Sequence, residues 1–265
     1  MHPISHRQHR RSGRCNGTIT KFPGQGGTLG GISSATDGNI WFTEPSTSQV
    51  AVISPTGTIT EYTTPTSNSN PMGITAGPDG NLWFVETDVN KIGTATLSGT
   101  ITEKTISNTY IGLTGITAGP DGNLWFTESF ANQVGRISTG GNVTEFKVPT
   151  ASAGLGAIAP GPDGNVWFTE SSANNVGRMT PTGAITEFAL PTPNSGPTGL
   201  TGGPDGNIWF SETPGNRIGR ITPAGTITEY TVPAPRGLVT GADGNLWIIV
   251  EASGAKIGRF IPPTN

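Results

Sequence analysis

The sequence predicts an all-β fold, a six-bladed β-propeller of four-stranded antiparallel blades. Tryptophan recurs at a nearly constant interval, the same text surrounds each copy, and glycine and proline stand at fixed places between short apolar runs. A period near 40 residues with turn residues at constant offsets is typical of propeller blades. No segment keeps the apolar period of a helix.

The tryptophans mark the repeat. The first five are 42 residues apart and the last interval is 38 residues. They are all the tryptophans of the chain: Trp41, Trp83, Trp125, Trp167, Trp209 and Trp247. A large aromatic side chain that recurs in every unit is expected to pack between neighbouring sheets.

Each repeat divides into four short strands, A to D. Strand A resembles residues 74–77, strand B reads NLWFTE, strand C resembles residues 132–138, and strand D resembles residues 226–230. An Asp-Gly turn joins strands A and B. Its glycine supplies the positive φ of a tight hairpin, and its aspartate is expected to bond the turn backbone.

The two ends of the chain predict how the ring closes. Residues 17–22 (GTITKF) read as a lone strand D, and residues 255–261 (AKIGRFI) read as a final strand C. Pairing these segments would complete the sixth blade and remove an open sheet edge. We therefore expect a flexible basic tail at residues 1–16 and a single propeller domain at residues 17–265. A seven-bladed relative that lost one blade is the alternative.

Composition excludes several kinds of partner. The net charge is −3, without the basic stripe that nucleic acids require, and no apolar run is long enough to cross a bilayer. Cys15 is the single cysteine, so no intrachain disulfide forms. The tail lacks the apolar segment of a signal peptide. We expect a cytoplasmic monomer that binds neither nucleic acid nor membrane.

The string PxGITxGPDGNLWFTE…NxIGRIT…GxITEF resembles the streptogramin lyases, also called virginiamycin B lyases, over residues 17–261. This resemblance implies a carbon–oxygen lyase that uses Mg²⁺, a histidine and nearby glutamates to open the ester of streptogramin B antibiotics by elimination, which inactivates the antibiotic. Enzymes of that family look seven-bladed, so this chain departs from them by one blade.

The histidines of that family stand just before the glycine that begins strand A. Six equivalent positions exist here, which we call the mouth slots, and none holds histidine: Gly30, Met72, Thr114, Gly156, Thr198 and Arg236. Ala234 replaces a family glutamate two residues before the last slot. Glu251, four residues after Trp247, does match the family pattern. The histidines of this chain, His2, His6 and His9, all lie in the tail.

Most B strands end in a glutamate three residues after the tryptophan. These five glutamates are Glu44, Glu86, Glu128, Glu170 and Glu212. Such a ring could attract cations, but repetition in the blades favours hydrogen bonds to an adjacent blade or turn. Arg236 is the one charged mouth slot, in a shortened loop, and could bind an anionic group or form a salt bridge to Glu251 or Glu212.

Three functions follow from these residues. The first is a family member without efficient lyase chemistry that binds a small molecule or peptide at the mouth through Arg236, Thr198, Thr114, Met72 and Glu212. The second is an active lyase in which Glu251 holds Mg²⁺ or acts as the base and Arg236 stabilises the enolate-like charge. The third is a structural or interaction propeller from a longer protein.

Overall fold

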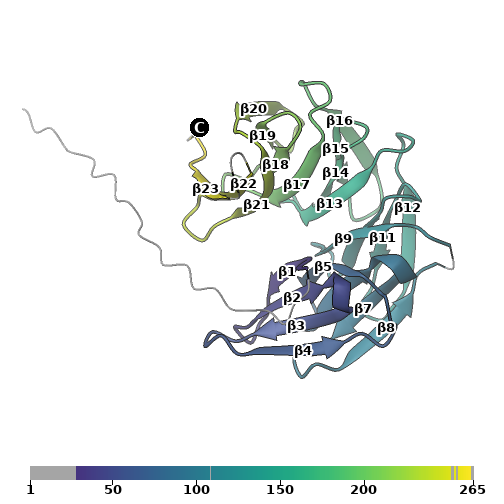
Figure 1. Ribbon diagram of the computed structural model, residues 1–265. Coiled ribbons are helices and arrows are strands. Elements are labelled where there is room, and N and C mark those ends of the chain that lie inside the picture. Colours follow the sequence, from purple (N-terminus) through teal and green to yellow (C-terminus); the bar gives the residue numbers. More distant parts are fainter. Residues whose placement is uncertain (1–27, 108, 252–253, 255, 264–265) are drawn as a thin grey trace, which may run out of the picture.

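The computed structural model describes residues 28–107, 109–251, 254 and 256–263. Within these residues the chain forms six antiparallel sheets that follow one another along an arc, each sheet being one blade (Figure 1). Five sheets have four strands and the last has three. The predicted all-β, six-bladed architecture is therefore confirmed. Helical structure among the described residues is limited to two short 3-10 turns, η1 (Pro45–Thr47) and η2 (Thr87–Val89).

The strands occur in chain order within every blade. The first three blades are β1 (Ile32–Ser34), β2 (Ile40–Glu44), β3 (Gln49–Ile53) and β4 (Ile59–Thr63); β5 (Pro71–Ala76), β6 (Leu82–Glu86), β7 (Lys91–Ala95) and β8 (Ile101–Thr105); and β9 (Leu113–Ala118), β10 (Leu124–Glu128), β11 (Gln133–Ile137) and β12 (Val143–Lys147). The last three are β13 (Leu155–Pro160), β14 (Val166–Glu170), β15 (Asn175–Met179) and β16 (Ile185–Ala189); β17 (Pro197–Gly202), β18 (Ile208–Glu212), β19 (Arg217–Ile221) and β20 (Ile227–Thr231); and β21 (Pro235–Thr240), β22 (Leu246–Val250) and β23 (Lys256–Phe260).

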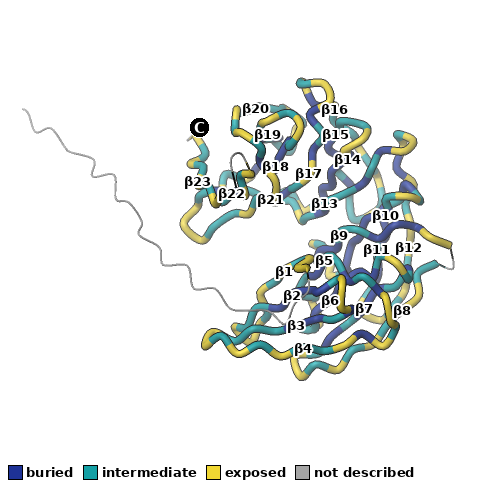
Figure 2. Tube along the Cα trace, viewed as in Figure 1, coloured by how far each residue is buried: buried dark blue, intermediate teal, exposed yellow. Residues whose placement is uncertain are grey.

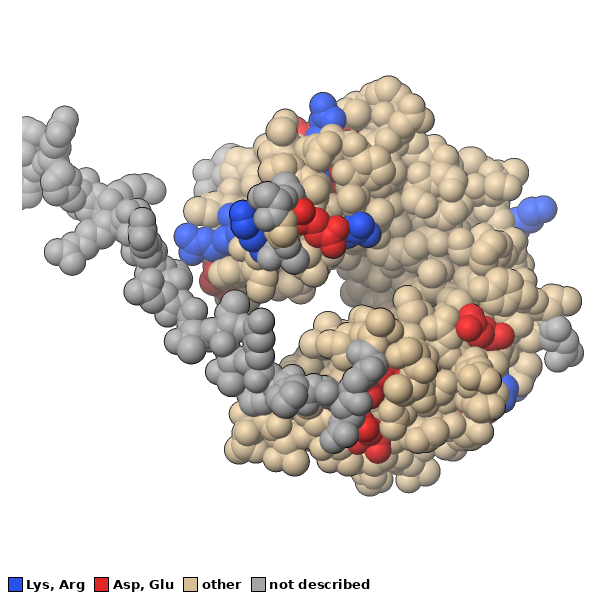
Figure 3. Space-filling view, in the orientation of Figure 1, with Lys and Arg blue, Asp and Glu red and all other residues tan. Residues whose placement is uncertain are grey.

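The first strand of each blade faces the centre of the arc. Neighbouring inner strands contact one another from β1 to β21, so they form the wall of a central channel (Figure 1). Across the open side of the arc, the first and last blades stand apart (Figures 1 and 3). The predicted closing strand, residues 17–22, and the tail, residues 1–16, lie outside the described residues, so closure stays a prediction.

Five of the six tryptophans pack between blades, as the sequence predicts, whereas Trp247 is partly buried and lines a hollow on the last blade. Trp41 is fully buried and lies in one cluster with Ile74, Leu82 and Phe84 of the next blade. Its ring also stacks on Tyr62 of its own outer strand, with centroids 5.7 Å apart. Burying a large apolar side chain stabilises the fold by roughly 1.5–3 kcal/mol, and this contact is repeated along the arc. The core is consequently a series of blade-to-blade interfaces (Figure 2).

The Asp-Gly turns bind their own backbone as predicted, and in every blade but the first the aspartate also accepts a hydrogen bond from the tryptophan indole. In the third blade Gly122 has a φ of 75°, and Asp121 Oδ1 accepts a hydrogen bond from Asn123 N at 3.3 Å. The same oxygen accepts a hydrogen bond from Trp125 Nε1 at 2.9 Å. These donors hold the pKa of Asp121 below its ordinary value even though burial of the carboxylate acts in the opposite direction. The turn thereby fixes the indole that fills the next interface.

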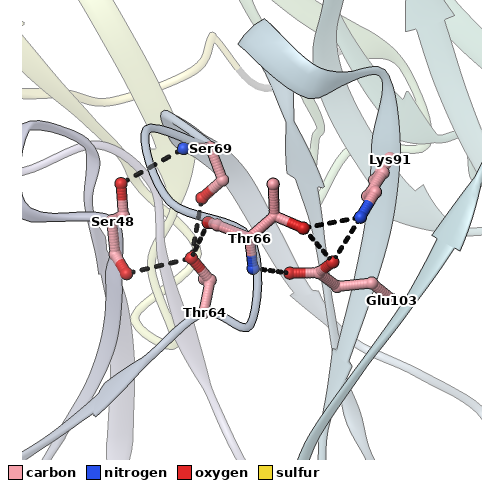
Figure 4. Close-up of polar contacts among 6 residues, drawn as sticks. All are labelled: Ser48, Thr64, Thr66, Ser69, Lys91 and Glu103. Atoms are coloured by element: carbon pink, nitrogen blue, oxygen red, sulfur yellow. Dashed lines mark hydrogen bonds and ion pairs between the residues drawn. The ribbon is translucent and has the colours of Figure 1, made fainter.

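A polar clamp joins the first and second blades (Figure 4). Thr66, in the link between β4 and β5, donates to Glu103 from its backbone N at 2.8 Å and from its hydroxyl at 2.5 Å. Lys91 Nζ lies 2.7 Å from the same carboxylate. A hydrogen bond within the same link joins the hydroxyls of Thr64 and Ser69, which are 2.9 Å apart. The threonine–glutamate contact recurs at two later links, as Thr150–Glu187 and Thr192–Glu229.

The described part of the chain contains no helix with the length and hydropathy that a bilayer crossing requires.

Candidate functional site

The inner strands come close to each other just after the mouth slots. Gly31 N donates to Met72 O at 3.0 Å, which ties β1 to β5. A Cβ atom added at Gly199 would lie 2.9 Å from Arg236 O, too close for any other residue without movement. The glycine after the slot therefore lets the next inner strand come near. As a result, the slot residues follow one another around the mouth of the channel.

Arg236 and Glu251 form an ion pair at this mouth. Arg236 Nε donates to Glu251 Oε2 at 2.7 Å. The side chains keep 57% and 44% of their surface exposed, so both can still meet a ligand. Of the two roles that the sequence left open for Arg236, the structure shows the salt bridge, with Glu251 as its partner.

The short loop before β21 brings these two residues together. Ala234 adopts a left-handed conformation, with a φ of 43°, and its backbone N donates to Asn216 Oδ1 at 2.9 Å. Its carbonyl accepts a hydrogen bond from Glu251 N at 3.0 Å. Because alanine adopts positive φ at a cost of about 1 kcal/mol or more, these contacts are what hold the backbone in place. They set Glu251 next to the strand that carries Arg236.

Thr198 is connected to the same part of the mouth. Its side chain is exposed, and its hydroxyl oxygen lies 2.9 Å from Thr213 Oγ1. Thr213 in turn donates to the carbonyl of Pro235, directly before Arg236, at 2.6 Å. A chain of hydroxyl contacts thus runs from Thr198 to the strand that bears the ion pair. The structure places Thr198, Arg236 and Glu251 together.

The other predicted ligand-binding residues lie elsewhere. Met72 and Thr114 are half-buried slots of the second and third blades, and Met72 packs against the hydrophobic cluster of its neighbour. Glu212 is fully buried, so its carboxylate has no exposed surface to offer at the mouth. Burial and the nearby carboxylate of Glu229 raise the pKa of Glu212 to about 7. The structure does not bring Glu212 to the ion pair.

The glutamates that end the B strands are buried acids. Glu44 is 1% exposed, and the other four are fully buried. Both oxygens of Glu128 lie buried without a hydrogen-bond partner, so the hydrogen bonds expected from the sequence are absent there. Burial and the neighbouring Glu145 raise the pKa of Glu128 to about 8. Burial and the neighbouring Glu103 raise the pKa of Glu86 to about 8, and burial is the largest cause that raises the pKa of Glu170 to about 7.

Sequence reasoning missed these paired acids. Each buried glutamate of a B strand meets the glutamate of the D strand in its own blade, as Glu128 meets Glu145. A signal was present in the sequence, because the D-strand glutamate recurs in every blade that has the B-strand glutamate. A neutral carboxylic acid is the expected state of such a group near pH 7.

The described residues do not fit a Mg²⁺ site. No three histidine, cysteine, aspartate or glutamate side chains among them gather closely enough to hold a metal ion. Glu251, the expected ligand, lies against the guanidinium of Arg236, which repels a second cation. The described residues therefore do not provide the magnesium site that the resemblance implies.

Charged side chains gather over the last blade in the face shown by Figure 3, whereas most of that face is uncharged. The last blade carries Arg236 and Glu251 at the ends of β21 and β22. A charged, exposed pair beside a largely neutral channel wall is suited to orient a small polar ligand, since few fixed polar groups usually set the orientation in such sites.

Repeated four-stranded blades around a channel, with an ion pair at the channel mouth, define a β-propeller with a candidate site on one face. The sequence profile of the virginiamycin B lyase family matches residues 7–111 and 104–263. The chain belongs to this family. No curated protein matches it.

Solved structures agree with this assignment. The chain is 38% identical to virginiamycin B lyase from Staphylococcus aureus, with a TM-score of 0.82 over 89% of this chain and 85% of that one. It is 39% identical to a catalytically inactive histidine-to-alanine variant of virginiamycin B lyase from Staphylococcus aureus, solved with Quinupristin, with a TM-score of 0.82 over 88% and 84% of the two chains. A streptogramin B lyase structure is 33% identical, with a TM-score of 0.81 over 89% and 84%.

Proposed function

We propose that this chain binds a streptogramin B-type cyclic antibiotic at the channel mouth and opens its ester inefficiently or not at all. The observation that carries the proposal is the occupant of the last mouth slot. Arg236 stands there, ion-paired to Glu251 and exposed, and residues 10–265 contain no histidine.

The absence of a histidine from the mouth slots is expected to lower the rate of catalysis. A general acid or base with a pKa near the working pH contributes roughly 10²–10⁴-fold to a rate. Arginine stays protonated and threonine is not an ordinary base, so neither Arg236 nor Thr198 replaces a histidine in proton transfer. The inactive relative solved with Quinupristin has lost a histidine, which supports ligand binding in the absence of turnover.

The ion pair suits recognition. The guanidinium of Arg236 offers several donors to ligand carbonyl oxygens, and the carboxylate of Glu251 accepts hydrogen bonds from ligand N–H or O–H groups. A cyclic depsipeptide carries both kinds of group. Thr198 adds an exposed hydroxyl that can donate or accept.

Calorimetric titration of the full chain with Quinupristin tests this proposal. We expect saturable binding of one molecule, weakened at least about tenfold by Arg236→Ala, the loss of a charged hydrogen-bonding group being worth about 1.4 kcal/mol or more. Lys147→Ala removes an exposed cation of the outer strand β12 and serves as the matched control, with unchanged affinity. Absence of binding, or equal affinity of the Arg236→Ala variant, would overturn the proposal.

A second candidate, an active lyase, is favoured by the position of Glu251. Its spacing from Trp247 matches the family pattern, and its exposed carboxylate could take a proton from a bound ligand. In that case Arg236 would stabilise the negative charge that develops on the ligand. Ring opening that is lost in Glu251→Gln while binding persists would favour this candidate over the first.

A further inference from the structure

Two exposed aromatic rings lie against each other on the third blade. Tyr110, in the link between β8 and β9, is 53% exposed, and Phe130, in the turn between β10 and β11, is 72% exposed. Their ring centroids are 5.1 Å apart, with 39° between the ring planes. In the other ring pairs of the described residues, both rings are buried or half-buried. We call Tyr110 and Phe130 the aromatic platform, because much of their apolar surface is open to a ligand.

The aromatic platform departs from the repeat. The positions equivalent to Phe130 hold Ser46, Asp88, Ser172 and Pro214, and those equivalent to Tyr110 hold Asn68, Ser152 and Asn194. The same link and turn therefore form in other blades without an aromatic residue, so the fold does not require the two rings. Apolar surface that stays in water contributes little to folding, whereas a ligand that covers it gains the free energy of burial. Binding explains the rings where folding does not.

Backbone contacts hold the aromatic platform in place. Phe130 N donates to Ile111 O at 3.0 Å, and Ser129 N donates to Gly112 O at 2.8 Å. Gly112 has a φ of 70°, and a Cβ atom added there would collide with the ring of Phe130. The ring therefore lies directly on the backbone of the link that carries Tyr110. Because the two loops are tied together before a ligand arrives, little ordering free energy opposes binding.

The aromatic platform adjoins the mouth slot of the third blade. Thr114, the slot residue, donates its hydroxyl to Gly112 O at 3.3 Å. Leu113 at the start of β9 pairs with Glu128 at the end of β10, so the turn that carries Phe130 lies at the mouth end of the blade. Thr114, which the sequence predicts as a ligand-binding residue, thus has an aromatic surface beside it.

The surroundings of the aromatic platform favour an uncharged ligand group. Residues 105–118 and 129–135, which contain the link and the turn, include no lysine, arginine, histidine, aspartate or glutamate. Aromatic rings prefer tilted or offset contacts with other rings, at centroid distances of about 4.5–7 Å. A neutral aromatic ring is therefore the group that these two side chains are suited to bind. The ion pair of Arg236 and Glu251 belongs to the last blade, so a ligand that contacts both sites has to extend across the mouth.

We propose that the aromatic platform binds an aromatic ring of the same ligand whose polar groups meet Arg236 and Glu251. This inference rests on the proposed function and specifies the class of ligand: a large cyclic compound with an aromatic side chain, rather than a small polar one. Tyr110 and Phe130 are binding residues that contribute to specificity, and they take no part in proton transfer.

Calorimetric titration with Quinupristin, a cyclic depsipeptide with aromatic side chains, tests the aromatic platform. Phe130→Ala and Tyr110→Ala should each weaken binding about fivefold or more, because stacked rings contribute beyond the area that they bury. Phe130→Trp keeps a flat ring and should retain the affinity of the unaltered chain. Two controls should leave the affinity unchanged: Ser172→Ala, at the equivalent position of the next blade, and Leu97→Ala, which removes an exposed apolar side chain from the turn between β7 and β8.

A smaller probe separates this inference from the proposed function. N-acetylphenylalanine amide carries one neutral aromatic ring, and saturation-transfer NMR detects weak binding of such a compound. We expect transfer to its ring protons from the unaltered chain, weaker transfer from Phe130→Ala, and unchanged transfer from Ser172→Ala.

The outcomes for the two hypotheses differ. If Quinupristin binds the unaltered chain and Phe130→Ala equally, the aromatic platform is wrong and the proposed function stands. If Quinupristin binds neither, the proposed function fails and the small probe decides: weaker transfer from Phe130→Ala keeps the platform as an aromatic site, and equal transfer rejects it. Phe130→Ala should lower Tm by no more than about 2 °C, because an exposed side chain contributes little to folding. A larger fall would mean that the ring supports the fold, and it would overturn the proposal.

Discussion

The Nε atom of Arg236 lies 2.7 Å from Oε2 of Glu251, in an ion pair that joins the start of β21 to the end of β22. Both side chains are about half exposed, so water and salt screen their attraction. The pair is therefore suited to exchange its internal contact for contacts with a ligand. It contributes little to the stability of the fold.

Removal of this pair should barely affect unfolding. Exposed ion pairs contribute about 0.2–1 kcal/mol, and an Arg236→Ala variant should lower Tm by no more than about 4 °C. Calorimetric unfolding of the variant, with Lys147→Ala as the exposed control, measures this. A large loss of stability would mean that Arg236 is structural, and its effect on ligand binding would then need another explanation.

The buried acids predict that stability falls as pH rises. The folded-state pKa values of Glu86 and Glu128 are raised from the ordinary 4.5 to about 8. Below pH 4.5 both the folded and the unfolded state bind these protons. Between 4.5 and 8 the unfolded state releases them while the folded state retains them, so folding stability is lost through this window and levels off above it. Denaturant titrations from pH 5 to 8 measure the loss.

The Glu128→Gln variant measures the effect of one of these acids on stability. An amide matches a protonated carboxyl in shape and carries no charge, so the variant should be more stable than the unaltered chain at pH 8, by an amount on the order of 2–4 kcal/mol. At pH 5 the two proteins should differ little. A free energy of unfolding that is independent of pH, or a variant that is less stable at pH 8, would show that Glu128 is ionised in the folded protein.

The clamp between the first two blades predicts that substitutions of its residues cause coupled losses of stability. Thr66→Val removes a hydroxyl donor from Glu103, whose side chain is only 7% exposed, and should cost about 1–3 kcal/mol. Glu103→Gln removes the charge that Lys91 also contacts. In a double-mutant cycle the two changes should be less than additive, because they break the same contact. Strict additivity would show that the link between β4 and β5 is held by other interactions.

Alanine substitutions at two glycines test the packing inside a blade. A Cβ at Gly135 would lie 2.1 Å from the ring of Phe126, across the pair of strands β10 and β11. Gly135→Ala should therefore displace this buried ring and lower the free energy of unfolding by about 1–3 kcal/mol or more, as overpacked core substitutions do. Gly140→Ala, in the turn after β11, meets only Ser138 Oγ at 3.8 Å and should be nearly neutral. Equal effects of the two substitutions would contradict this packing.

Much of the fold followed from local chemistry in the repeat. The spacing of tryptophans such as Trp125 and the Asp-Gly turns such as Asp121–Gly122 recur in each blade, so they determine strand order and the packed face without long-range information. Glu128 was harder to predict. Its burial depends on the blade that covers it and on Glu145 across the sheet, and these are tertiary contacts.

The candidate site was predictable only in part. Arg236 and Glu251 stood out because each departs from the repeat, one by its charge and the other by its spacing. Their direct contact depends on the left-handed turn at Ala234, which is not a residue that sequence rules place at positive φ. Glu212 was named from its position at a strand end, but that end is covered by neighbouring side chains.

The most direct test of the proposed function follows the ligand itself. Quinupristin is incubated with an excess of the full chain and Mg²⁺, then separated by liquid chromatography with tandem mass spectrometry, because elimination adds no atoms and leaves the intact mass unchanged. The account predicts that the cyclic compound is recovered intact while calorimetry shows it bound. Rapid and complete conversion to the linear product, lost in Glu251→Gln, would contradict it.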